Sequence, residues 1–281
     1  MTIQNFKLFR DKCYINGEWI EANSKDTILV NNPATLKEIG TVPKCGKEET
    51  KKAIDAANAA WPKWKSTSAK ERSIILRKWF DLIISNKEEL AQIMTIEQGK
   101  PINESRGEIV YGASFIEWFA EEAKRVYGDT IPDPLTDRRI VVLKQPVGVV
   151  ASITPWNFPN AMITRKCAPA LAVGCPVVIK PASQTPYSAL ALAALAEEAG
   201  FPKGTLNVIT GKASEIGDEL ATNPIVRKLS FTGSTEIGKV LINNQYPFAL
   251  IKYLDENYIG KSNFNTKEAS IKIEKPDWIK N

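Results

Sequence analysis

The sequence predicts an α/β protein with a doubly wound, mostly parallel sheet, preceded by a helical and hairpin portion. From Val147 onward, short β-rich runs alternate with stretches rich in Ala and Leu. The predicted strands start 29, 30 and 22 residues apart, which is typical of repeated βαβ units. Their near-continuous apolar character indicates a parallel sheet covered on both faces. The predicted strands are Val147–Ile153, Pro176–Ile179, Leu206–Ile209 and Lys228–Phe231, and the predicted helices are 161–173, 186–199, 213–222 and a last one from Thr235.

The portion before Val147 begins with a predicted hairpin. In the segment Tyr14–Trp19, Asn16-Gly17 stands between strand-forming residues, and this dipeptide is a strong signal for a two-residue hairpin turn.

Helices follow the hairpin. Ser68 and Glu71 have the spacing of a capping box, which predicts that a helix begins there and continues to Asn86. Gly99 and Pro101 then interrupt a second helical pattern, so we expect another helix pair around them. The apolar stripes of these helices are typical of core packing.

Composition excludes several classes of protein. The chain has 281 residues, a formal net charge of +5, 43% hydrophobic and 25% charged residues, which are globular values compatible with about two domains. The chain contains no long run of like charges, so the sequence does not predict a nucleic-acid partner. The complete absence of histidine excludes Ser-His-Asp and Cys-His catalysis and any His-ligated metal site, and no metal is expected.

Cysteine usage and hydropathy predict a cytoplasmic protein without a membrane partner. The four cysteines show no Cys-x-x-Cys spacing, which favours a reducing compartment over a zinc or disulfide framework. We find neither a signal-peptide pattern at the N-terminus nor an apolar stretch of about 18 residues that could span a membrane.

Turn residues follow each strand of the predicted sheet, where open α/β sheets bind their ligands. Gly233 and Ser234 would open the last helix with free amides and a hydroxyl group, an arrangement suited to a pyrophosphate. The standard G-x-G-x-x-G fingerprint is absent. The four strand-end segments are Thr154–Pro159, Lys180–Pro186, Thr210-Gly211 and Phe231–Gly238.

In this order and spacing, the four segments resemble the NAD(P)-binding domain of the aldehyde dehydrogenase superfamily. Within it, Ile163–Lys166 and Lys180–Pro186 are most similar to bacterial NAD(P)-dependent succinate-semialdehyde dehydrogenases. Tyr14–Trp19 and Glu97–Pro101 also fit the family pattern, and the resemblance covers about residues 10–243. It implies a nicotinamide cofactor, a small aldehyde substrate and oxidation of succinate semialdehyde to succinate, a reaction of 4-aminobutyrate degradation.

The resemblance also implies roles for residues of the cofactor site. Trp156 would lie against the diphosphate, Lys180 would hydrogen-bond the adenine ribose or its phosphate, and Gly233 with Ser234 would hold the pyrophosphate. Many NAD-using relatives carry Glu at the position of Ser183, where a carboxylate repels a 2′-phosphate. Serine removes that repulsion, so NADP is slightly favoured over NAD. The other residues expected in this site are Thr154, Pro155, Ala182, Gly211, Phe231 and Ile237.

Two further residues correspond to the family's reacting end. Asn157 matches the side-chain donor of the oxyanion hole, and a turn-capping asparagine is the alternative interpretation. Arg165 matches the position that receives the substrate carboxylate, for which a guanidinium group is well suited. The alternative for Arg165 is a solvated helix face.

Two catalytic motifs of the family are absent from the 281 residues: the nucleophilic cysteine of Gly-Gln-x-Cys and the general-base glutamate of Glu-Leu-Gly-Gly. Cys167 and Cys175 stand in apolar surroundings and are predicted to be inert buried thiols. We therefore expect a catalytically incompetent chain without the catalytic domain. The alternatives are a cofactor-binding or assembly module, which docks on a full-length relative or forms a homo-oligomer through the strand Arg139–Gln145, or a decayed product without function.

The chain divides at Asn244. Residues 1–244 form the predicted N-terminal and NAD(P)-binding region, and residues 245–281 do not match the family pattern. In these last 37 residues, Ile, Lys, Asn, Tyr and Phe account for 20. Such residues have A/T-rich codons, so an out-of-frame or fused tail is one hypothesis, and a divergent extension is the other.

Overall fold

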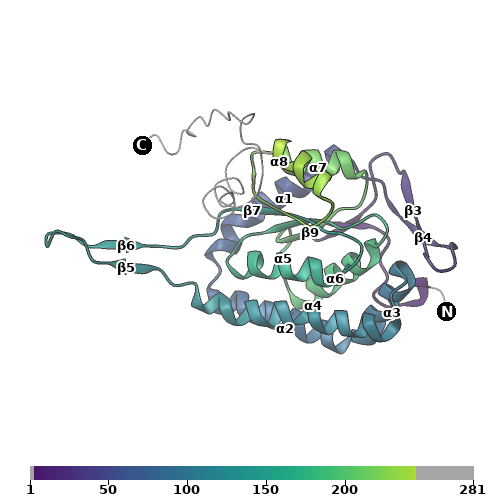
Figure 1. Cartoon of the computed structure of the whole chain (residues 1–281), viewed down its shortest axis with the longest axis horizontal. Helices are drawn as coiled ribbons and strands as arrows, with labels where there is room; N and C mark the ends of the chain where they lie inside the picture. The colour runs from purple at the N-terminus through teal and green to yellow at the C-terminus, as the bar shows by residue number, and fades with distance from the viewer. Residues whose placement is uncertain (1–2, 245–281) are drawn as a thin grey trace.

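A six-stranded sheet forms the centre of the protein, and a computed structural model describes residues 3–244. The strand order is β10-β7-β8-β9-β1-β2, and the first four strands are parallel, as predicted (Figure 1). These four strands are β7 (Val149–Ile153), β8 (Val177–Lys180), β9 (Leu206–Val208) and β10 (Val226–Phe231). Each one lies within two residues of its predicted bounds, because buried parallel strands leave a continuous apolar signal in the sequence.

The predicted hairpin is also present, and it extends the sheet. Strands β1 (Cys13–Ile15) and β2 (Glu18–Ile20) pair antiparallel around Asn16 and Gly17, which both have positive φ as a type I′ turn requires. Tyr14 pairs antiparallel with Val208 of β9, so the hairpin continues the sheet at that edge. The sequence predicted the turn but not its partner strand.

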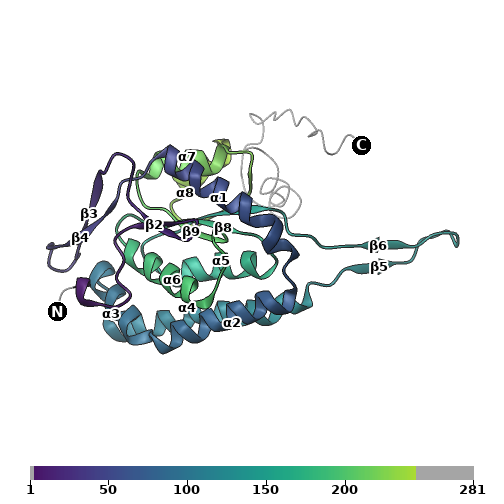
Figure 2. The ribbon, with the colours of Figure 1, turned by 180° about the vertical axis from the view of Figure 1, so that it is seen from behind.

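Helices cover both faces of the sheet, as a doubly wound fold requires (Figures 1 and 2). On one face lie α5 (Ala161–Ala172) and α6 (Pro186–Ala199). On the other lie α1 (Lys47–Ser66), α7 (Ala213–Thr222) and α8 (Thr235–Asn244).

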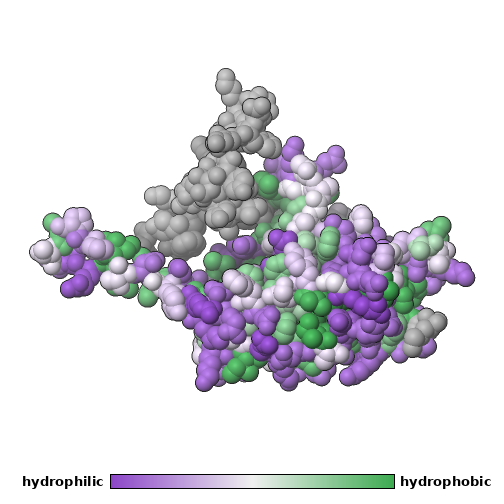
Figure 3. All heavy atoms as spheres, turned by 60° about the horizontal axis from the view of Figure 1, so that its bottom comes forward, coloured by the Kyte–Doolittle hydropathy of each residue, from purple (hydrophilic) through white to green (hydrophobic). Residues whose placement is uncertain are grey.

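An outer layer of three helices packs against α5 and α6. It consists of α2 (Ala69–Ser85), α3 (Lys87–Gln98) and α4 (Ile102–Glu122). The predicted capping box begins α2: Ser68 Oγ accepts the N–H of Glu71 at 3.2 Å, and Glu71 Oε2 accepts the N–H of Ser68 at 3.0 Å. The outer surface of this layer is mostly hydrophilic, with separate hydrophobic patches (Figure 3).

Two smaller hairpins complete the described fold, together with short 3-10 turns at Ile3–Asn5 and Ala123–Arg125. Strands β3 (Thr27–Asn31) and β4 (Glu38–Pro43) form the first. Strands β5 (Asp129–Ile131) and β6 (Ile140–Val142) form the second, an arm that extends away from the body (Figure 1). The predicted strand Arg139–Gln145 therefore forms only through Ile140–Val142. Exposed hydrophobic side chains on the arm are those of Ile131, Leu135, Ile140, Val141, Val142 and Leu143.

The predicted tail 245–281 lies outside the described residues. Between residues 3 and 244, no helix is both long and apolar enough to cross a membrane. The same part of the chain contains no group of three or more His, Cys, Asp or Glu side chains placed to hold a metal ion.

Candidate functional site

The carboxyl ends of the parallel strands meet at one edge of the sheet. Ile153 at the end of β7 pairs in register with Lys180 of β8 and with Phe231 of β10. Beyond the ladder, the N–H of Thr154 donates to Lys180 O at 3.2 Å, and the N–H of Thr232 donates to Ile153 O at 3.1 Å. The turns that lead into α5, α6 and α8 therefore begin side by side.

A buried carboxylate closes the N-terminus of α5. Glu108 of α4 accepts the backbone N–H groups of Asn160 and Ala161 at 3.0 and 3.2 Å, which satisfies donors that a helix leaves free. Its second oxygen forms an ion pair with Lys100, and both side chains are almost fully buried. Lys100 also donates to Asn157 O at 3.0 Å, so this pair holds the loop that carries Asn157.

A second buried acid closes the N-terminus of α6. Glu97 of α3 accepts the N–H groups of Tyr187 and Ser188 at 2.7 and 2.8 Å. Burial raises the pKa of Glu97 to about 8, while these hydrogen bonds act in the opposite direction. No nearby cation accompanies this carboxyl in the way that Lys100 accompanies Glu108, among the ion pairs of residues 3–244.

The turn before α7 is filled by another part of the backbone. Gly211 has φ +147°, and an added Cβ would lie 2.0 Å from Cys45 O. The N–H of Lys212 donates to that same oxygen at 2.9 Å. Close packing against Cys45 therefore explains the glycine, and the contact predicted between Gly211 and a cofactor stays a prediction.

The N-terminus of α8 is open. Gly233 and Ser234 are exposed, and Ser234 Oγ accepts the N–H of Ile237 at 3.4 Å, as an N-cap does. A Cβ on Gly233 would lie 2.5 Å from the ring of Phe231, so a side chain here would displace that ring. Within the described chain, no carboxylate accepts a hydrogen bond from the first amides of α8. Of the helices that begin at this edge, α8 therefore leaves its positive end available to an external anion.

A buried cation and an unpaired hydroxyl group lie at the same edge. Lys180 is almost fully buried, and burial lowers its pKa to about 8. Thr154 is also buried, and its Oγ1 has no hydrogen-bond partner in the described structure. The other predicted residues on these two turns become more exposed with distance from the sheet: Ala182 is buried, Pro155 and Ser183 are partly buried, and Trp156 is 54% exposed.

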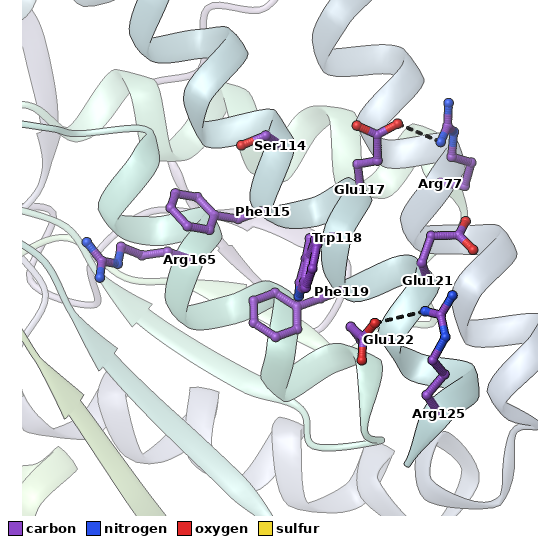
Figure 4. Close-up of a pocket in the computed structure, with 10 residues that line it drawn as sticks. All are labelled: Arg77, Ser114, Phe115, Glu117, Trp118, Phe119, Glu121, Glu122, Arg125 and Arg165. Atoms are coloured by element: carbon purple, nitrogen blue, oxygen red, sulfur yellow. Dashed lines mark hydrogen bonds and ion pairs between the residues drawn. The ribbon is translucent and has the colours of Figure 1, made fainter. Parts of the chain in front are cut away.

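Asn157 and Arg165 lie before and within α5. Asn157 is exposed in the preceding loop, and Arg165 is exposed on the second turn of the helix. The Arg165 guanidinium lies 5.6 Å from the ring centre of Phe115 and forms no ion pair within residues 3–244. Arg165 and Phe115 line a cavity of about 920 Å³ bordered by α2, α4 and α5, whereas Asn157 does not line it. In this cavity Arg77 and Arg125 pair with Glu117 and Glu122 (Figure 4). Arg165 is therefore the arginine of this cavity whose charge no carboxylate of the described chain neutralises.

Cys167 and Cys175 are buried, as predicted. They are 0% and 2% exposed, and burial raises the pKa of both, that of Cys167 to about 12. Neither thiol has the lowered pKa that a nucleophile needs.

Sequence reasoning missed the functions of Glu97, Lys100 and Glu108. Glu97 and Lys100 entered only as parts of a family motif, and Glu108 was not singled out. One signal was present: an acid and a lysine flank Gly99, where one helix ends and the next begins, so their side chains can reach neighbouring helix ends.

Comparisons with known proteins show what the chain is similar to. The model of the aldehyde dehydrogenase family matches residues 19–254. The chain is 63% identical over 242 residues to glutarate-semialdehyde dehydrogenase of Pseudomonas aeruginosa. It is 60% identical over 242 residues to succinate-semialdehyde dehydrogenase [NADP(+)] of Escherichia coli. Each match covers 86% of this chain and 50% of the relative.

Among solved structures, an NADP-dependent enzyme of E. coli superposes with a TM-score of 0.84 at 61% identity, covering 84% of this chain and 49% of that one. Betaine aldehyde dehydrogenase from Staphylococcus aureus in complex with NAD+ has a TM-score of 0.83 at 38% identity, covering 86% and 48%. The chain thus spans about half the length of the curated relatives it matches.

Proposed function

Because the chain belongs to the aldehyde dehydrogenase family, we propose that its first 244 residues form a nicotinamide dinucleotide-binding region with NADP or NAD as cofactor. The observation that carries the proposal is the open N-terminus of α8, at the same edge of the sheet as the buried Lys180. Residues 245–281 form a separate segment in this proposal.

The residues at the sheet edge fit such a cofactor. Gly233 and Ser234 offer free amides to the pyrophosphate, and Thr154 offers a buried hydroxyl without a partner. Lys180 supplies a cation or a donor for the adenine ribose and its phosphate, and Trp156 has the exposed surface to lie along the diphosphate. Pro155, Ala182, Ser183, Gly211, Phe231 and Ile237 complete the proposed lining.

NADP is slightly favoured over NAD. Ser183 places no negative charge on the turn after β8, so a 2′-phosphate meets no repulsion from this position. Lys180, three residues earlier, gives that phosphate a cation.

The substrate class we propose is a small aldehyde that carries a carboxylate at its other end, with succinate semialdehyde as the substrate of choice. The named relatives act on succinate or glutarate semialdehydes, which share this chemistry. The unpaired guanidinium of Arg165 would bind the carboxylate, and the Asn157 amide would donate to the aldehyde oxygen as negative charge develops on it. Bound nicotinamide supplies the hydride acceptor for the oxidation.

This chain is proposed to bind the cofactor without turning over the aldehyde. Its 281 residues contain neither the Gly-Gln-x-Cys nor the Glu-Leu-Gly-Gly motif, and Cys167 and Cys175 are buried. Loss of a covalent nucleophile alone costs several orders of magnitude in rate. The proposed location is the cytoplasm, a reducing compartment in which the four free cysteines would stay reduced.

The β5–β6 arm supports a second candidate function, assembly with a full-length relative or another copy of this chain. The arm extends from the body and exposes Ile140, Val141 and Leu143 to solvent. Isolated two-stranded hairpins are marginally stable, so an arm of this kind gains from a partner. Val141→Asp should lower the molar mass measured by light scattering if the arm joins subunits.

Titration with NADP and NAD tests the main proposal. Tryptophan fluorescence should fall on binding, and Trp156→Phe should remove part of that signal. Absence of binding by both nucleotides at millimolar concentration would overturn the assignment. Oxidation of succinate semialdehyde at about 1 per second or faster would overturn the inactive state of the chain.

A further inference from the structure

Cys13 and Cys45 are 32 residues apart in the chain, but their sulfur atoms lie 3.6 Å from each other. Cys13 belongs to β1, and Cys45 lies between β4 and α1. Both residues are fully buried, and both thiols are free. Of the four cysteines, these two have their sulfur atoms in contact, whereas Cys167 and Cys175 lie elsewhere in the core.

The surroundings of Cys13 stabilise its thiolate. The hydrogen bond with the Cys45 thiol lowers the pKa of Cys13, burial opposes this change, and Thr210 adds to the lowering. The N–H of Thr210 donates to Cys13 Sγ at 3.2 Å, and Thr210 Oγ1 lies 3.3 Å from the same sulfur. A thiolate is the form of cysteine that reacts with oxidants.

Cys45 is 0% exposed but borders a hollow in the surface. It lines a surface cavity of about 470 Å³, together with Lys44, Gly46 and Lys212. A cavity of this size admits a molecule as small as hydrogen peroxide. Because the two sulfur atoms are 3.6 Å apart, an oxidant that reaches one of them is close to both.

We propose that Cys13 and Cys45 form a redox-active dithiol, which hydrogen peroxide converts into an intramolecular disulfide. The Cys13 thiolate attacks one peroxide oxygen, the O–O bond breaks, and with one proton the other oxygen leaves as water. The Cys45 sulfur then attacks the Cys13 sulfenic sulfur, and the displaced hydroxide takes the Cys45 proton to form a second water. Two thiols are oxidised, and one peroxide is reduced to two waters.

Disulfide formation needs only a small movement of the two sulfur atoms, but backbone hydrogen bonds hold the segment that carries Cys45. A disulfide bond is about 2.05 Å long, so the two sulfurs must approach by roughly 1.5 Å. The N–H of Cys45 donates to Thr210 O at 3.2 Å, and its carbonyl accepts the N–H of Lys212 at 2.9 Å. The disulfide would thus tie β1 to the start of α1 across the end of β9.

This dithiol goes beyond the proposed function, because neither cysteine belongs to the proposed cofactor or substrate site. Its test needs no cofactor, so the failure of one proposal leaves the other intact.

Peptide mapping of the oxidised native chain tests the proposal. The chain is treated with one equivalent of hydrogen peroxide, alkylated with iodoacetamide in denaturant and digested without reductant. We expect one cross-linked species, the Cys13 peptide joined to the Cys45 peptide, with Cys167 and Cys175 alkylated. Recovery of Cys13 and Cys45 as alkylated thiols or separate oxyacids would overturn the proposal, as would equal linkage to Cys167 or Cys175.

Two controls separate native proximity from random pairing. The same treatment in urea should give a mixture of pairings, because unfolding removes the 3.6 Å contact. Cys167→Ala should keep the Cys13–Cys45 cross-link of the native protein, and its loss in that variant would contradict the assigned pair.

Discussion

The N-termini of α5 and α6 differ from the N-terminus of α8, although all three helices begin at the same edge of the sheet. Glu108 and Glu97 accept the first amides of α5 and α6 from inside the protein. At α8, Gly233 and Ser234 leave the corresponding amides exposed. A helix N-terminus attracts negative charge, and this chain satisfies two of these termini internally and leaves one for a ligand. The closed termini therefore define the binding position as much as the open one does.

The largest expected effect concerns the closed terminus of α5. Glu108→Ala removes the acceptor of two buried amides and leaves Lys100 buried without its partner. Breaking a buried ion pair in this way costs about 3–5 kcal/mol of unfolding free energy. Urea denaturation should show this loss.

Glu104→Ala is the matched control, since Glu104 is exposed on the same helix. Its midpoint should stay close to that of the unchanged protein. Equal losses in the two variants would show that Glu108 has no special part in closing α5.

The closed terminus of α6 predicts a pH dependence of stability. The pKa of Glu97 is about 8 in the folded protein, against an ordinary value of 4.5. Between these values the folded chain holds a proton that the unfolded chain has released. The contribution of Glu97 is therefore complete below pH 4.5 and is lost as pH rises to about 8. Thermal melts at pH 5, 6.5 and 8 should show this decline, and Glu97→Gln should flatten it; an unchanged slope in that variant would exclude Glu97 as the cause.

The choice between NADP and NAD is expected to depend on the turn after β8. Ser183→Glu places a carboxylate where a 2′-phosphate is expected, and like charges repel. We expect the Kd for NADP to rise about tenfold relative to that for NAD, which corresponds to about 1.4 kcal/mol. Calorimetric titration with both nucleotides measures the ratio, and Gln184→Glu, on the exposed neighbouring residue, is the control. An unchanged ratio would remove Ser183 from the site.

A smaller effect should follow the charge of Lys180. Its pKa is about 8, so the side chain loses its positive charge as pH rises from 7 to 9. The affinity for NADP should fall a few-fold over this interval, more than that for NAD, because the phosphate loses a nearby cation. Lys180→Met should remove the difference between NADP and NAD in the pH dependence of affinity. Lys212→Met, at an exposed lysine, should keep that difference. A pH dependence that survives in Lys180→Met would assign it to another group.

Structural features that depend on residues close together in the chain could be predicted from the sequence. The apolar runs of the parallel strands, the Asn16-Gly17 turn and the Ser68 cap each depend on neighbours in the chain, and the structure confirms all three. The strand-end turns could be located for the same reason, because each one follows a predicted strand.

Long-range contacts could not be predicted from those patterns. Tyr14 pairs with Val208, Glu97 accepts a hydrogen bond from Tyr187, and Cys13 contacts Cys45. Each contact depends on tertiary packing, which a local sequence pattern does not indicate. An acid on a helix is usually solvated, and the sequence alone does not reveal that a second helix ends against it. The closed termini of α5 and α6 therefore became visible only with the fold.

Closing α8 by substitution is the most direct measurement of the difference between these termini. Aspartate is as good an N-cap as serine, so Ser234→Asp should keep α8 folded while it places a carboxylate at the open amides, as Glu108 does at α5. We predict that calorimetric titration will show at least a roughly tenfold rise in the Kd for NADP, with a melting temperature equal to or above that of the unchanged protein. An unchanged Kd would contradict the assignment of the pyrophosphate to α8.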